Sequence, residues 1–182
     1  MTSRCNSLFR LILISILLLS APYEAYSSDA VETAGDAALV AVAAVAGGVT
    51  LWQKDKEGMV QFAGSAALDL AVTYGLKYAV SERRPNNEDD QSFPSAHASV
   101  SFTAAEYLRK RYGWEYGLPA YAVAAFVGYS RVESKAHYVH DVLVGAAIGM
   151  ASSYLLTTPY SDIKLAADIS PGYLGVKVSS AW

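Results

Sequence analysis

Apolar residues gather in five segments along the middle of the chain, separated by short polar connections. The segments cover residues 37–51, 60–80, 96–109, 118–129 and 139–157. Apolar runs of this length, bounded by polar residues and glycines, predict helices packed against one another. Two carboxylates inside them, Asp69 and Glu106, are poor neighbours for lipid. The pattern predicts an all-α helical bundle.

The composition of the chain indicates that the bundle lies in a membrane. Hydrophobic residues make up 53% of the chain and charged residues 17%, which is more apolar than an ordinary soluble domain. We therefore expect the bundle to be membrane-embedded, and a soluble helical domain is the alternative. The formal net charge of -3 argues against a nucleic-acid partner, because nucleic-acid proteins usually carry a basic surface.

Basic residues in the connections indicate an orientation. Lys54 and Lys56 lie in the first connection, and Arg109, Lys110 and Arg111 lie in the third. If the segments cross a membrane, these two connections share one side, which the positive-inside rule assigns to the cytoplasm. The second and fourth connections then face the periplasm, at the inner membrane of a bacterial envelope.

The N-terminal residues resemble an export signal. Arg4 and Arg10 precede an apolar run over residues 11–21, and the small-residue pattern Ala25-Tyr26-Ser27 follows. The run is shorter than the roughly 20 residues of a membrane span. Residues 1–27 are therefore predicted to be a signal peptide, with an uncleaved anchor as the alternative.

The C-terminal residues follow a different period. Residues 163–169 and 174–178 alternate between apolar and other side chains around the turn Pro171-Gly172, which predicts a small β-hairpin or extended tail. A strand pair covering the helices is favoured over one that docks on a membrane or partner. The predicted organisation is thus a helical domain over residues 28–159 and a tail over residues 160–182.

Three polar clusters fall at the ends of the predicted helices. Lys77 and Arg84 are seven residues apart and converge if their helix persists. Pro94-Ser95-Ala96-His97 opens a helix whose first N–H groups are free to bind an anion, although Ser95 can also be a simple helix cap. The third cluster is Ser130-Arg131, followed by His137 and, one helical turn later, by Asp141.

Together these clusters supply what phosphoryl transfer requires. Three cations and a helix N-terminus stabilise the phosphate oxygens. A histidine beside a carboxylate can act as a nucleophile, and a second histidine can protonate the leaving group and then activate water. The sequence shows no compact metal-ligand spacing, so we expect neither a metal nor a cofactor, with the cations taking the place of a metal.

The ordered motifs Lys77-x6-Arg84-Pro85, Pro94-Ser95-Ala96-His97 and Ser130-Arg131-x5-His137-x3-Asp141 resemble the signature of the type 2 phosphatidic acid phosphatase superfamily. That superfamily also includes bacterial acid phosphatases and vanadium haloperoxidases. The resemblance implies phosphate binding by Lys77, Arg84, Ser95, the N–H of Ala96 and Arg131. It implies that His97 is the general acid, that His137 is the nucleophile that becomes phosphorylated, and that Asp141 orients His137. Ala96 stands where the family usually has glycine.

Nearby residues are assigned lesser roles. His140 is interpreted as a rim or structural residue, and the acidic run Glu88-Asp89-Asp90 as a solvated loop. The expected substrate is an amphiphile such as a phospholipid, polyprenyl or lipid A phosphate. The alternatives are a soluble periplasmic acid phosphatase, a haloperoxidase and a non-catalytic membrane protein.

Overall fold

The computed structural model describes residues 28–160, 162–170 and 173–181. In this part of the chain, five helices precede two strands. The helices are α2 (Ser28–Trp52), α3 (Lys56–Val80), α4 (Ala96–Tyr112), α5 (Trp114–Glu133) and α6 (Val139–Leu156), and the strands are β1 (Asp162–Ser170) and β2 (Tyr173–Ala181). The prediction of an all-α bundle is confirmed.

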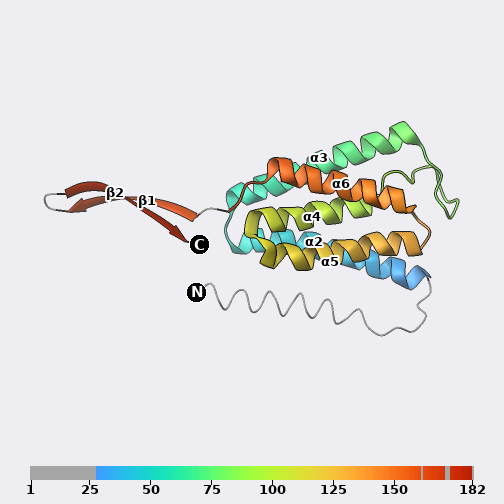
Figure 1. Cartoon of the computed structure of the whole chain (residues 1–182), viewed down its shortest axis with the longest axis horizontal. Coiled ribbons are helices and arrows are strands. Elements are labelled where there is room, and N and C mark those ends of the chain that lie inside the picture. The colour runs from blue at the N-terminus through green and yellow to red at the C-terminus, as the bar shows by residue number, and fades with distance from the viewer. Residues whose placement is uncertain (1–27, 161, 171–172, 182) are drawn as a thin grey trace.

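Helix α4 lies at the centre, and the other four helices pack around it (Figure 1). Its buried side chains are mostly small or polar, as at Ala98, Ser99, Ser101 and Thr103. Small side chains let helices approach closely. A Cβ at Gly149 of α6 would lie 2.1 Å from the Ser99 carbonyl oxygen, so α4 and α6 touch backbone to backbone there.

The outer surface of the bundle is apolar where a soluble protein would be polar. Large hydrophobic side chains are well exposed on four helices, for example Val40 of α2, Val60 of α3, Leu118 of α5 and Leu143 of α6. Two described helices, α2 and α6, are long and apolar enough to cross a membrane. A wide apolar surface of this kind fits a lipid environment.

The carboxylates that suit lipid poorly are inside the bundle. Asp69 is fully buried, and its Oδ2 accepts a hydrogen bond from Ser99 Oγ at 3.2 Å. Glu106 is also buried and forms an ion pair with Arg109, with 2.6 Å between Oε2 and Nε. Because both groups have polar partners inside the protein, they do not oppose a membrane location.

Helices α2, α3 and α5 begin earlier than the sequence predicts, whereas α3 ends where it predicts. Helix α2 begins at Ser28, so the polar residues before position 37 are helical. Helix α5 begins at Trp114, directly after Gly113, which ends α4 with a φ of 95°. Helix α3 ends at Val80, because Ser81 adopts the left-handed conformation with a φ of 48°. Arg84 therefore lies on a loop and not on the helix of Lys77.

The tail forms the predicted hairpin. β1 and β2 pair antiparallel, with Ser170 opposite Tyr173 and Asp162 opposite Ala181. Figure 1 shows the strands extending away from the bundle, so the prediction that they cover the helices is wrong. The predicted signal peptide at residues 1–27 lies outside the described residues, and the domain boundaries stay predictions.

Candidate active site

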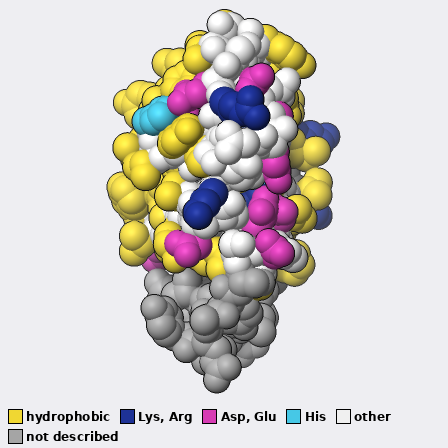
Figure 2. All heavy atoms as spheres, turned by 90° about the vertical axis from the view of Figure 1, so that its right-hand side faces the viewer, with side chains coloured by type: hydrophobic (Ala, Val, Ile, Leu, Met, Phe, Trp, Pro, Cys, Tyr) yellow, Lys and Arg dark blue, Asp and Glu magenta, His cyan; other side chains and the backbone are white. Residues whose placement is uncertain are grey.

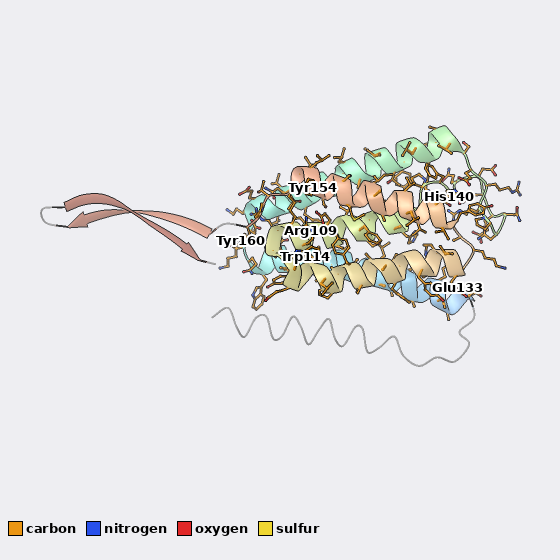
Figure 3. The ribbon with its side chains drawn as sticks, viewed as in Figure 1. Arg109, Trp114, Glu133, His140, Tyr154 and Tyr160 are labelled. Atoms are coloured by element: carbon orange, nitrogen blue, oxygen red, sulfur yellow. The ribbon has the colours of Figure 1, made fainter. Side chains whose placement is uncertain are left out.

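The three predicted clusters meet at one end of the bundle. This end is formed by the last turn of α3, the loop over residues 81–95, the first turns of α4 and α6, and the last turn of α5. His140 and Glu133 mark it in Figure 3, while Arg109, Trp114, Tyr154 and Tyr160 mark the opposite end. Viewed along the bundle onto this end, acidic and basic side chains gather on a surface flanked by hydrophobic ones (Figure 2).

His137 lies in the connection between α5 and α6, with its side chain 3% exposed. Its Nδ1 is 3.6 Å from Oδ2 of Asp141 and makes no hydrogen bond to a described group. The expected hydrogen bond between the two is therefore not formed in this state, although the groups face one another. Asp141 Oδ2 instead accepts hydrogen bonds from Ser92 Oγ at 2.5 Å and from the Tyr138 backbone N–H at 2.9 Å.

The surroundings of His137 favour the neutral imidazole. Burial lowers its pKa most, the charges of Lys77 and Arg84 lower it further, and Asp141 opposes them, leaving the pKa at about 4. A neutral imidazole has a free lone pair at neutral pH. His137 thus has the protonation state that a nucleophile needs.

Lys77 and Arg84 reach this region from different elements. The buried Lys77 ammonium group donates hydrogen bonds to the backbone carbonyls of Gln91 at 2.5 Å and Ser92 at 3.4 Å. Arg84 Nε forms an ion pair with Asp89 Oδ1 at 2.7 Å. One member of the acidic run therefore partners a site cation, while all three of its residues are exposed, in agreement with the interpretation as a solvated loop.

The start of α4 brings Ser95, Ala96 and His97 to the same end. Ser95 is the N-cap and accepts a weak hydrogen bond from the Ala98 N–H at 3.4 Å. Ala96 is the first residue of the helix, where backbone N–H groups lack partners within the helix. The His97 imidazole is 37% exposed at the rim of the site. Burial of its inner part and the charge of Arg131 lower its pKa, while Asp36 opposes them.

Arg131 approaches from the last turn of α5, and its side chain is 3% exposed. Its Nη1 lies 3.0 Å from Asp36 Oδ1 and 3.3 Å from Glu32 Oε1. Asp36 Oδ1 also lies 3.1 Å from His97 Nε2. All predicted site residues thus share this end of the bundle, with α2 as an additional wall.

The prediction from sequence missed four residues at the site: Glu32, Asp36, Glu82 and Ser92. The four-residue step between Glu32 and Asp36 was a usable signal, because on a helix it places both carboxylates on one face. The non-helical interpretation of the residues before position 37 concealed it. Ser92 carries no signal of this kind.

One group in the described residues can hold a metal ion. Ligand atoms of Glu82, His140 and Asp141 lie within 4.8 Å of one another, with His140 Nε2 at 3.1 Å from Glu82 Oε1 and 3.0 Å from Asp141 Oδ1. The spacing of these residues in the sequence does not predict this group. His140 is 55% exposed, in agreement with its interpretation as a rim residue.

Comparison with known proteins identifies the class. The sequence pattern that defines the PAP2 superfamily matches residues 58–163. A lipid A 4'-phosphatase of Helicobacter pylori is 32% identical in an alignment 142 residues long, which covers 71% of this chain and 72% of that protein. A lipid A 1-phosphatase of Porphyromonas gingivalis is 36% identical in an alignment 94 residues long, which covers 47% of this chain and 21% of that protein.

Solved structures agree at the level of the fold. The crystal structure of Aquifex aeolicus LpxE has a TM-score of 0.53 and 20% identity, over 74% of this chain and 98% of that one. A transmembrane PAP2-type phosphatidylglycerolphosphate phosphatase from Bacillus subtilis has a TM-score of 0.57 and 23% identity, over 85% of each chain. The fold is that of a membrane phosphatase, and the protein belongs to the PAP2 superfamily.

Proposed function

We propose that this protein is a lipid phosphate phosphatase that works through a phosphohistidine intermediate on His137 and faces the periplasm. The observation that carries the proposal is the convergence of Lys77, Arg84, Arg131 and two histidines at one end of a bundle with an apolar outer surface. The cations attract a phosphate, and the surrounding surface suits a substrate whose tail stays in lipid.

The reaction proceeds in two balanced steps. In the first, a ring nitrogen of His137 attacks phosphorus, the bond from phosphorus to the lipid oxygen breaks, and His97 gives that oxygen a proton. In the second, water attacks the phosphohistidine, His97 takes a proton from the water, and the bond from phosphorus to nitrogen breaks to release phosphate. Asp141 stabilises the positive ring of His137 by closing the 3.6 Å separation.

The cations are proposed to do the work of a metal. Three fixed positive charges can balance the charge on the three equatorial oxygens of the transferring group. The free N–H groups at the start of α4 add neutral donors. EDTA is therefore expected to leave activity unchanged.

Lipid A is the first substrate to test, because the two relatives named above act on it. The apolar surface of the bundle favours a membrane enzyme over the soluble acid phosphatase considered from the sequence. Phosphate release from lipid A, phosphatidic acid, phosphatidylglycerol phosphate, undecaprenyl diphosphate and a soluble monoester is the discriminating measurement. Mass spectrometry of the lipid A product shows which phosphate leaves.

His137→Ala is expected to lower phosphate release roughly 10³-fold or more, as loss of a nucleophile does. Rapid acid-free quenching with radiolabelled substrate is expected to trap a phosphoenzyme in the wild type and none in the variant. The chain has three histidines, so His140→Ala is the matched control and is expected to keep the phosphoenzyme. Efficient cleavage of the soluble monoester without release from any lipid contradicts the proposed substrate class, and an active His137→Ala enzyme contradicts the mechanism.

A further inference from the structure

The N-terminal half of α2 contributes charged groups to the site, and none of the three sequence motifs includes them. The superfamily pattern begins at residue 58, after α2 has ended. Yet Asp36 Oδ1 lies 3.1 Å from His97 Nε2 and 3.0 Å from Arg131 Nη1. A single carboxylate from α2 therefore joins the proposed general acid to a proposed phosphate-binding cation.

Close packing holds this carboxylate in place. A Cβ at Gly35 would lie 1.9 Å from Ser130 Oγ and 2.9 Å from Arg131 Nη2, so only a glycine lets α2 approach α5 here. Arg131 Nη2 then donates a hydrogen bond to the backbone carbonyl of Glu32 at 2.6 Å. Two neighbouring contacts thus hold the backbone of α2 beside Asp36, whose own side chain is 53% exposed.

We propose that Asp36 is a positioning residue for the proposed reaction, holding His97 and Arg131 in register for the acid–base steps. The Asp36 carboxylate accepts a hydrogen bond from the Nε2–H group of His97. This leaves Nδ1 of His97 as the atom that exchanges a proton with the substrate oxygen and with water. His97 and Asp36 then form a second imidazole–carboxylate pair, beside His137 and Asp141. The inference rests on the proposed function.

The charges around His97 explain why the carboxylate matters. Arg131 from α5 and Arg84 from the loop over residues 81–95 are the cations that act on His97, and Asp36 from α2 is the opposing anion. Removing Asp36 leaves two cations facing the imidazole. Protonated His97 then becomes harder to form, and the fraction of enzyme able to protonate the leaving group falls at neutral pH.

Helix α2 also offers a matched control. Glu32 Oε1 lies 3.3 Å from Arg131 Nη1, whereas the carboxylate that forms an ion pair with His97 is that of Asp36. Glu32→Gln therefore removes a carboxylate from Arg131 while leaving the His97 pair intact. Asp36→Glu keeps the negative charge that Asp36→Asn removes. It therefore tests whether a carboxylate at this position is sufficient for activity.

The test is the pH dependence of phosphate release by purified full-length protein in detergent, with the lipid that the wild type cleaves best. Asp36→Asn is expected to move the alkaline limb of kcat/KM to lower pH by about one unit and to lower kcat about 10-fold to 100-fold, as partial loss of acid–base catalysis does. Glu32→Gln is expected to change KM and leave the limb in place. Asp36→Glu is expected to return the limb toward its wild-type position.

Thermal unfolding of each variant in the same detergent separates misfolding from the proposed effect, because a folding defect lowers the active fraction without moving the limb. A wild-type pH profile in Asp36→Asn overturns the inference, as does an equal shift in Glu32→Gln. If the wild type cleaves no phosphate ester, the proposed function fails and takes the inference with it. An active wild type beside an unshifted Asp36→Asn variant overturns this inference alone.

Discussion

The two site histidines differ in their surroundings, and this difference assigns their proposed roles. His137 is 3% exposed and lies near Lys77 and Arg84, so it is held neutral. His97 is 37% exposed and has a carboxylate 3.1 Å from its Nε2. A nucleophile must be neutral before attack and a general acid must be protonated. Burial and cations lower the pKa of both histidines, but His97 is more exposed and its neighbour Asp36 favours the protonated form.

The pKa of His137 can be measured directly. Carbon-13 NMR of histidine-labelled protein is expected to show one ring titrating near pH 4, because burial and the two cations oppose its protonation. The signal is expected to be missing in His137→Ala and present in His140→Ala. A His137 ring that titrates near the ordinary value of about 6.5 contradicts the buried, cation-facing site.

The lowered pKa of His137 also makes the free energy of unfolding depend on pH. The folded-state pKa of His137, about 4, lies below its unfolded value, so the unfolded state takes up the proton first as pH falls. The titration of His137 therefore does not change the free energy of unfolding above about pH 6.5, and it lowers that free energy as pH falls toward 4. His137→Asn, which cannot titrate, is expected to lose less thermal stability over this window than the wild type.

At the scale of elements, the contact between α4 and α6 sets the position of the site. A Cβ at Gly145 would lie 2.4 Å from the Ser95 carbonyl oxygen, and one at Gly149 would lie 2.1 Å from the Ser99 carbonyl oxygen. Backbone atoms cannot move aside as a flexible side chain can. The two glycines therefore bring the start of α6, with Asp141, against the start of α4, with Ser95.

Gly149→Ala is expected to lower the free energy of unfolding by about 1–3 kcal/mol, as overpacking of a tight contact does. Gly48 in α2 is the matched control, because a Cβ there meets nothing within 4 Å, and Gly48→Ala is expected to stabilise its helix by up to about 1 kcal/mol. Thermal unfolding in detergent measures both. Equal stability in the two variants contradicts the close α4–α6 contact.

The sequence predicts elements better than it predicts how they approach one another. The apolar segments place five helices, although α2, α3 and α5 begin earlier than predicted. The four-residue step from His137 to Asp141 brings the two side chains face to face, although His137 precedes α6 and its Nδ1 makes no hydrogen bond to Asp141. The position of Arg84 on a loop could not be predicted, because it depends on the left-handed conformation of Ser81, which ends α3. The role of Asp36 could not be predicted either, because its partner Arg131 lies on α5 and is distant in sequence. Local patterns do not contain such long-range partners.

At the scale of the whole molecule, the bundle buries several polar side chains beside its apolar core and exposes many large apolar ones. Asp69, Ser99 and Glu106 are buried, whereas large apolar side chains such as Leu143 and Leu155 are exposed. Helix α2, at 1.5 Å per residue, spans roughly 37 Å, enough to cross a hydrocarbon core of about 30 Å. The acidic groups of its first turns lie at the site, so the site is expected at the level of the lipid headgroups.

The orientation of this bundle in the membrane is the remaining prediction. Lys54 and Lys56 lie at the end of the bundle opposite to the site, and so does Arg109, which Figure 3 labels far from His140. The positive-inside rule keeps such basic connections in the cytoplasm. The site end, with the exposed Asn87 on its loop, is then expected to face the periplasm.

Cysteine labelling tests this arrangement in intact spheroplasts of a Gram-negative host. Cys5 is the single native cysteine, so Cys5→Ser gives a clean background for Asn87→Cys and Lys56→Cys. A membrane-impermeant maleimide is expected to label position 87 in intact spheroplasts and to reach position 56 only after lysis. The reverse pattern would place the site in the cytoplasm, where it would meet lipids before export. Labelling of both positions in intact spheroplasts would contradict a membrane-spanning bundle, because only a membrane between the two ends can protect one of them.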